Sequence, residues 1–262
     1  MTYSLIPELK TLVHFYRILG IRWSLECHHS PETLLSPCSE LPLSMPRSTP
    51  STFESSPNLD EIHTLEALRH ALEAFEGCAL KHSATNLVFA DGNPNARVMF
   101  IGEAPGFEED QKGRPFVGRA GQLLDRMLAS IGLDRDSVYI INTIPWRPPG
   151  NRAPTPDELA ACAPFVHRHI DLCHPDLMVC LGGVSAQALL GIKGGILRNR
   201  GHWFTYSARD KHIPALATLH PAYLLRQPAQ KALAWRDLCA LREKLDALSL
   251  REQEECATVK KT

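Results

Sequence analysis

The chain has 262 residues, of which 44% are hydrophobic, and a formal net charge of −1. This size and composition predict one catalytic domain with added segments rather than two full domains. The nearly neutral charge excludes a protein that coats nucleic acid with a globally basic surface, so any contact with DNA must use a local basic patch.

The sequence predicts neither export nor a membrane span. The first residues, MTYSLIPELK, lack the charged and apolar regions of a secretory signal. The longest apolar runs, such as residues 177–184, are far shorter than the roughly 20 residues that cross a bilayer. The eight cysteines are scattered along the chain, which is typical of reduced thiols. We therefore expect a soluble, cytosolic protein.

Residues 1–58 are expected to be an appendage. Apolar residues between positions 6 and 26 recur at a helical period and predict a short N-terminal helix, whereas residues 29–58 are dense in Ser, Pro and Thr and predict a flexible linker. A helix resumes at about residues 59–75. We expect the main domain to span residues 59–247 and residues 248–262 to form a charged C-terminal tail.

The main domain alternates strand-like and helix-like stretches. Strands are predicted at 97–102, 138–143, 177–183 and 215–220, and helices at 118–131, at 156–173, up to 190, and at 229–247. This alternation predicts an α/β fold: a single three-layer α/β/α domain with a central, mostly parallel four-stranded sheet, plus the N-terminal helix and flexible linker. The best-defined boundary is TPDE, where Thr155 is the expected N-cap and Glu158 completes a capping box.

Most of the unusual Gly, Pro, Asn and His residues follow the predicted strands directly. The loops are GEAPG after the first strand, NTIPWRPPGNR after the second, LGG after the third and HPAY after the fourth. Ligands bind at the carboxyl ends of the strands in open α/β sheets, so we expect these four loops to converge on one crevice.

Glu103 in GEAPG and His220 in HPAY are the candidate chemical groups of this crevice. An acid and a histidine that face each other can orient a water molecule and stabilise negative charge on a leaving group. Two alternatives remain for the isolated residues: Glu103 can belong to a surface turn with solvated acids, and His220 can simply cap the next helix.

Several long runs together resemble the family 4 uracil-DNA glycosylases. They are GEAPGFEEDQKGRPFVGRAGQLLDRML, INTIPWRPPGNRAPTPDEL, LGGVSAQALLG and LHPAYLLR, and they occur in the family's order across roughly residues 72–245. The resemblance implies an enzyme of base excision repair that flips uracil out of DNA and hydrolyses its N-glycosidic bond.

The resemblance also implies roles for the crevice residues. Glu103, in the turn with Gly102 and Ala104, would position the water, with Asp110 as the alternative acid, and His220 would stabilise the uracil anion. Phe116 would stack on the flipped base, and Asn142 would pair with the uracil edge by donating to O4 and accepting from N3–H. Without the surrounding motifs, Phe116 could be a core residue and Asn142 could cap a turn.

The implied partner is uracil-containing DNA, which a monomer would bind beside the chromosome in the cytoplasm of a bacterium, with no membrane involved. A protein that flips a base needs local cations that bind the phosphates. It also needs an apolar wedge, a side chain that fills the gap left in the base stack. Tyr223, Leu224 and Leu225 are the candidate wedge, and each candidate cation could instead be an ordinary solvated surface residue. The candidate cations are Arg147, Arg152, Arg200 and Arg226, with Lys193 and Arg198 nearby.

Family 4 enzymes typically carry a 4Fe-4S cluster on four cysteines, and the resemblance maps two of them onto Cys78 and Cys162. Phe75 and Trp146 stand at the other two positions, so two thiolate ligands are missing. We therefore expect no cofactor and expect both aromatic rings to fill the cluster's volume as an apolar core. Replacement ligands from Cys173 or Cys180 are the alternative.

Three rival functions differ in what they require. A related branch of the superfamily captures uracil-DNA covalently through a histidine in an insertion near RPP, and this chain has neither the insertion nor the histidine there. A catalytically silent DNA-binding module would not need Glu103, Phe116, Asn142 and His220 together. A nucleotide-binding α/β protein would need a GxGxxG or P-loop motif, and the sequence contains neither.

Overall fold

The computed structural model describes residues 59–209 and 211–259, with side chains up to residue 250. The expected N-terminal helix and linker of residues 1–58 lie outside the described residues. The last helix, α10 (Lys231–Val259), continues well past residue 247, so the boundary expected there between domain and tail falls inside a helix.

The four predicted strands are present and pair in parallel at the centre of the sheet. They are β2 (Val98–Gly102), β3 (Val138–Asn142), β4 (Leu177–Leu181) and β6 (His212–Thr218). The expectation of a four-stranded sheet is nevertheless wrong, because the sheet has six strands in the order β1-β3-β2-β4-β6-β5. The additional edge strands, β1 (Asp91–Gly92) and β5 (Trp203–Ser207), are both antiparallel to their neighbours.

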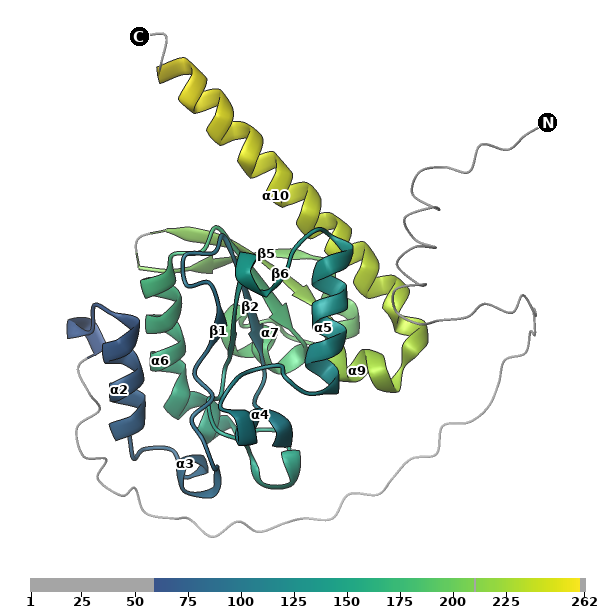
Figure 1. The fold of residues 1–262 in the computed structure, drawn as a ribbon. Coiled ribbons are helices and arrows are strands. Elements are labelled where there is room, and N and C mark those ends of the chain that lie inside the picture. The colour runs from purple at the N-terminus through teal and green to yellow at the C-terminus, as the bar shows by residue number, and fades with distance from the viewer. Residues whose placement is uncertain (1–58, 210, 260–262) are drawn as a thin grey trace, which may run out of the picture.

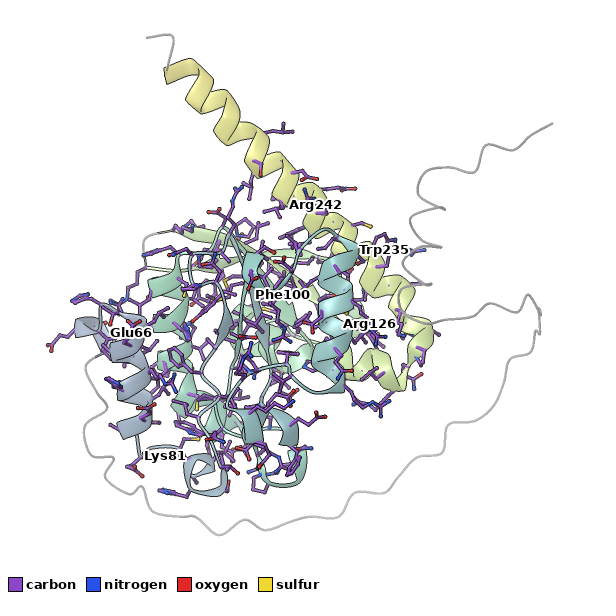
Figure 2. All side chains as sticks on the ribbon, viewed as in Figure 1. Glu66, Lys81, Phe100, Arg126, Trp235 and Arg242 are labelled. Carbon is purple, nitrogen blue, oxygen red and sulfur yellow. The ribbon has the colours of Figure 1, made fainter. Side chains whose placement is uncertain are left out.

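Helices cover both faces of this sheet, which confirms the three-layer arrangement (Figure 1). Side chains of β2 alternate between the faces. Val98 and Phe100 belong to a buried cluster with α5 (Arg119–Ser130) and α10, and both Phe100 and Trp235 of α10 are labelled in Figure 2. Met99 and Ile101 pack on the other face against α6 (Pro156–Cys173).

The remaining helices are short or lie at the rim. They are α2 (Leu65–Ala74), α3 (Leu80–Ser83), α4 (Phe107–Lys112), α7 (Gly183–Leu190), α8 (Ile196–Asn199) and α9 (Pro221–Arg226). Single 3-10 turns occur at Leu59–Glu61, Arg135–Ser137, Pro149–Asn151 and Pro228–Gln230. In the described part of the chain, no helix is both long enough and apolar enough to cross a bilayer.

The predicted capping box at the start of α6 is confirmed. The Glu158 N–H donates to Thr155 Oγ1 at 3.2 Å, and the Thr155 N–H donates to Glu158 Oε2 at 2.7 Å. Both bonds satisfy N–H groups that the helix leaves without partners. They also fix the end of the loop that follows β3 and carries part of the pocket described next.

Candidate active site

A pocket of about 400 Å³ opens at the carboxyl edge of the parallel strands. Three of the four predicted loops line it, namely those that follow β2, β3 and β6, together with the segment between α4 and α5. The lining residues are Glu103, Ala104, Pro105, Gly106, Glu109, Phe116, Ala120, Asn142, Pro148, Asn151, Arg152, His220, Ala222 and Arg226. The loop after β4 does not line the pocket but lies close behind it, because a Cβ atom at Gly182 would come within 3.1 Å of the His220 Cβ.

The backbone of Glu103 is fixed on the β2 side of the pocket. Its carbonyl oxygen accepts hydrogen bonds from the Ile144 N–H at 3.0 Å and from Thr143 Oγ1 at 2.7 Å, which ties its loop to the loop after β3. Burial raises the pKa of the Glu103 carboxyl, and the positive charge of Arg226 opposes that shift. The carboxyl group therefore lies in a partly dry site with one cation nearby that favours its ionised form.

His220 lies on the β6 side of the same pocket as the N-cap of α9. Its Nδ1 accepts a hydrogen bond from the Ala222 N–H at 3.1 Å, so the neutral ring carries its proton on Nε2. Burial, with repulsion from Arg226, lowers the pKa of His220 to about 4. At neutral pH the residue is therefore a neutral imidazole with a fixed tautomer whose Nε2–H can donate to an anion. The capping role considered as an alternative is therefore present, and it leaves the Nε2–H of this residue free of that bond.

Phe116, Asn142 and Gly102 form a narrow slot at the back of the pocket. The Phe116 ring lies 5.6 Å from the His220 ring, centroid to centroid. A Cβ atom at Gly102 would come within 2.4 Å of Asn142 Oδ1 and 2.6 Å of the Phe116 ring, so only glycine leaves both groups in place. Asn142 Oδ1 is the one buried side-chain polar atom in the described residues that has no hydrogen-bond partner. An amide oxygen in this state is suited to a polar ligand that enters the slot.

Three predicted site residues lie elsewhere. Asp110 is buried outside the pocket, where its Oδ1 accepts from the N–H groups of Thr85 and Asn86, so it does not face the site as an alternative acid. Arg200 is paired with Asp237, with Nε 2.9 Å from Oδ2, and Asp237 also accepts from Thr218 of β6. Leu224 is only 1% exposed and belongs to the core, so it cannot enter DNA as a wedge.

Of the other predicted DNA contacts, two line the pocket, whereas Tyr223 does not and packs partly buried against the core. Arg152 and Arg226 line the pocket, and Arg152 also forms an ion pair with Glu158. The Arg147 guanidinium lies 5.0 Å from the ring centroid of Phe107, an exposed aromatic that the sequence did not single out. Leu225, at 37% exposure, is the apolar side chain of α9 that faces solvent.

Sequence reasoning missed Glu109, which braces the pocket wall. Its Oε2 accepts from the Gly106 N–H at 3.1 Å, and its Oε1 accepts from the N–H groups of Val117 and Gly118 at 2.9 and 2.8 Å. The signal was available in the sequence: Glu109 is three residues after Gly106, the spacing at which an acid reaches back to the N-cap of a helix.

Cys78 and Cys162 meet in a separate apolar cluster with Phe75 and Trp146. The neighbouring Cys78 thiol and burial both raise the pKa of Cys162. Within the described residues, no group of three or more His, Cys, Asp or Glu side chains could hold a metal ion. Two thiols beside two aromatic rings do not match the four thiolates of a 4Fe-4S cluster, so these residues do not fit that cofactor.

Comparison with known proteins identifies the family of this fold and pocket. The model of the uracil DNA glycosylase superfamily matches residues 89–239, more than half of the chain, and the chain belongs to that superfamily.

Within the superfamily, the expected resemblance to type-4 enzymes is confirmed. A type-4 uracil-DNA glycosylase of Sulfurisphaera tokodaii is 39% identical over 185 residues, which cover 69% of this chain and 84% of that protein. One of Thermotoga maritima is 42% identical over 163 residues, covering 62% of this chain and 83% of that protein. A type-5 uracil-DNA glycosylase of Thermus thermophilus is 35% identical over 139 residues, 47% of this chain and 60% of that protein.

Proposed function

We propose that this protein flips uracil out of DNA and hydrolyses its N-glycosidic bond, leaving an abasic site for base excision repair. The observation that carries the proposal is the unpartnered, buried Oδ1 of Asn142 in the slot beside Phe116. Uracil supplies the matching edge, because its N3–H donates to Oδ1 while its O4 accepts from the amide nitrogen. Cytosine lacks the N3–H and carries an amino group in place of O4, so a fixed amide rejects it.

The two sides of the pocket supply complementary chemistry. Cleavage of the glycosidic bond leaves negative charge on uracil O2 and positive charge on the sugar. The neutral His220 donates its Nε2–H to the developing anion, and the Glu103 carboxylate orients the attacking water and stabilises the cationic sugar. A neutral imidazole suits this task, because its donor is fixed in place before the charge develops.

DNA binds across the pocket mouth in this proposal. Arg152 and Arg226 line the opening and contact phosphates on either side of the extruded nucleotide, with Arg147 beside them. The exposed Leu225 fills the gap in the base stack. The protein acts as a monomer on uracil-containing DNA.

Catalysis requires no cofactor in this proposal. What supports this is that Phe75 and Trp146 stand at two of the four positions that the resemblance assigns to cluster ligands, and that they pack with Cys78 and Cys162 in one apolar cluster. Every group assigned to the reaction belongs to the pocket itself.

A cleavage assay on matched oligonucleotides tests the function. Duplexes that differ only in one base, U, T, C or hypoxanthine, are incubated with the protein, and abasic sites are revealed by alkali. We expect cleavage of U and not of T or C. Cleavage of none of the four would overturn the proposal, and a heat-stable shifted band on a denaturing gel would indicate covalent capture instead of turnover.

A His220→Ala variant separates chemistry from binding. We expect its single-turnover cleavage rate to fall by orders of magnitude while its affinity for uracil-DNA stays within a few-fold of wild type. His70→Ala, a change of the same kind on the exposed face of α2, serves as the control and should leave both unchanged. An equal loss of rate and affinity in His220→Ala would refute the assigned role.

A further inference from the structure

The backbone of Phe116 adopts a conformation that its side chain disfavours. Its φ is 53°, in the left-handed region, and the residue is 5% exposed. A bulky non-glycine residue persists there only when its surroundings hold it in place. The orientation of the ring in the pocket therefore depends on whatever fixes this backbone.

Close packing against α5 is the first restraint. The Phe116 carbonyl lies directly over Gly121, where a Cβ atom would approach the carbonyl oxygen to 1.6 Å. On the C-terminal side, Glu109 accepts from the N–H groups of Val117 and Gly118. Neither contact gives the Phe116 carbonyl oxygen a hydrogen-bond donor.

Arg135 supplies that donor. Its Nη2 donates to the Phe116 carbonyl oxygen, and its Nη1 donates to the Pro115 carbonyl oxygen at 3.3 Å. The guanidinium is itself anchored, because Nε donates to Asp125 Oδ1 at 2.7 Å and Nη1 also pairs with Asp91. A planar guanidinium can make these bonds simultaneously, whereas a lysine ammonium cannot.

We propose that Arg135 is a positioning residue of the active site, which fixes the Phe116 ring from outside the pocket by holding its carbonyl oxygen. The inference rests on the proposed function, since it assigns the ring to the extruded base. Arg135 does not line the pocket, and its side chain is 21% exposed, so it acts through Phe116 rather than on the substrate.

Arg114 provides a matched control. Its Nε and Nη2 donate to the same Asp91 side chain, at 3.2 and 2.8 Å, but no bond joins it to Phe116 in the described structure. Arg135→Met and Arg114→Met therefore each remove one arginine from the same carboxylate, and only the first releases the Phe116 carbonyl.

The kinetic test is a double-mutant cycle with Phe116→Leu. We expect Arg135→Met to lower the single-turnover rate on uracil-DNA by roughly 10- to 100-fold, with DNA affinity unchanged, because small misplacements of a binding group cost this much. Arg114→Met should change the rate by less than about threefold. In the Phe116→Leu background the effect of Arg135→Met should shrink to less than about threefold, and multiplicative effects would overturn the inference.

A crystal structure of Arg135→Met tests the inference without relying on activity. We expect residue 116 to leave the left-handed region and its ring to turn away from His220. An unchanged φ at Phe116 would overturn the positioning role, whether or not the wild-type protein cleaves uracil-DNA. Absence of wild-type cleavage would instead overturn the proposed function, so the two failures are distinguishable.

Discussion

Replacing Gly102 with alanine tests the slot most directly, because the change adds a single methyl group. The new Cβ would lie 2.4 Å from Asn142 Oδ1 and 2.6 Å from the Phe116 ring, whereas ordinary contacts begin at about 3.4 Å. One or both groups must therefore move by about 1 Å. The φ of Gly102 is not in the left-handed region, so alanine introduces no backbone strain and the whole effect comes from this overlap.

A shift of about 1 Å in a group that positions the substrate lowers the rate on the order of 100-fold. We expect Gly102→Ala to lose about this much single-turnover activity on uracil-DNA. Overpacking should also lower the free energy of unfolding by about 1 to 3 kcal/mol, which leaves the domain folded. Quenched single-turnover assays measure the loss of rate, and thermal unfolding measures the loss of stability.

Gly183→Ala is the matched control, because Gly183 follows the neighbouring strand β4 and its Cβ would meet only Ile196, at 3.7 Å. We expect this variant to keep the wild-type rate. If Gly102→Ala cleaves uracil-DNA as fast as Gly183→Ala does, the base does not occupy the slot and the assignment of Asn142 and Phe116 is wrong.

Three further predictions concern pH, base selectivity and iron. Burial holds the pKa of His220 at about 4, below the 6.5 of the unfolded chain, so its contribution to stability is complete above pH 6.5 and is lost as the pH falls toward 4. Thermal unfolding of wild type and His220→Gln between pH 4 and 7 checks this, and a difference between them that does not vary with pH would contradict it. Asn142→Asp should weaken discrimination between uracil and cytosine in the oligonucleotide assay, and unchanged selectivity would argue against direct readout by the amide. The purified protein should be colourless, with no absorption at about 400 nm. Stoichiometric iron would refute the assignment of an apolar core in place of the cluster.

The centre of the fold could be predicted because its signals are local. Parallel strands buried on both faces appear as continuous apolar runs, and Val98–Gly102, Val138–Asn142 and Leu177–Leu181 are of this kind. The edge strands gave no such signal. Asp91–Gly92 has only two residues, and Trp203–Ser207 is partly exposed and depends on its pairing with β6.

The site likewise has residues with a local sequence signal and residues without one. Glu103, Asn142 and His220 could be placed together because each comes at the end of a parallel strand, and such ends share one edge of the sheet. Side-chain direction within a short helix could not be predicted. Asp110 and Glu109 are neighbours in α4, yet a turn of about 100° per residue sends one into the core and the other to the pocket wall.

Which arginines can contact phosphate could not be predicted, for another reason. Arg200 and Arg226 have the same charge and both follow strands or helices of the binding edge, but only the fold shows that Asp237 on α10 neutralises Arg200. An acid keeps an arginine from a phosphate when the pair is buried together: the Arg200 side chain is 14% exposed beside Asp237, whereas Arg152, paired with Glu158, remains 43% exposed. Asp237 lies 37 residues away from Arg200 in the sequence and leaves no local pattern.

The apolar cluster around Cys78 and Cys162 connects the pocket to the rest of the domain. Phe75 caps the end of α2, Trp146 lies in the loop after β3 two residues before the pocket-lining Pro148, and Cys162 lies on α6. The Phe75 ring packs on Phe165 with centroids 4.8 Å apart, and Trp146 is 3% exposed. A cluster with four thiolates would tie these three segments by coordination bonds, whereas here they are tied by buried rings. Burial of these large aromatic side chains fixes the loop at Trp146 against α2 and α6, and the same loop reaches the pocket wall two residues later at Pro148.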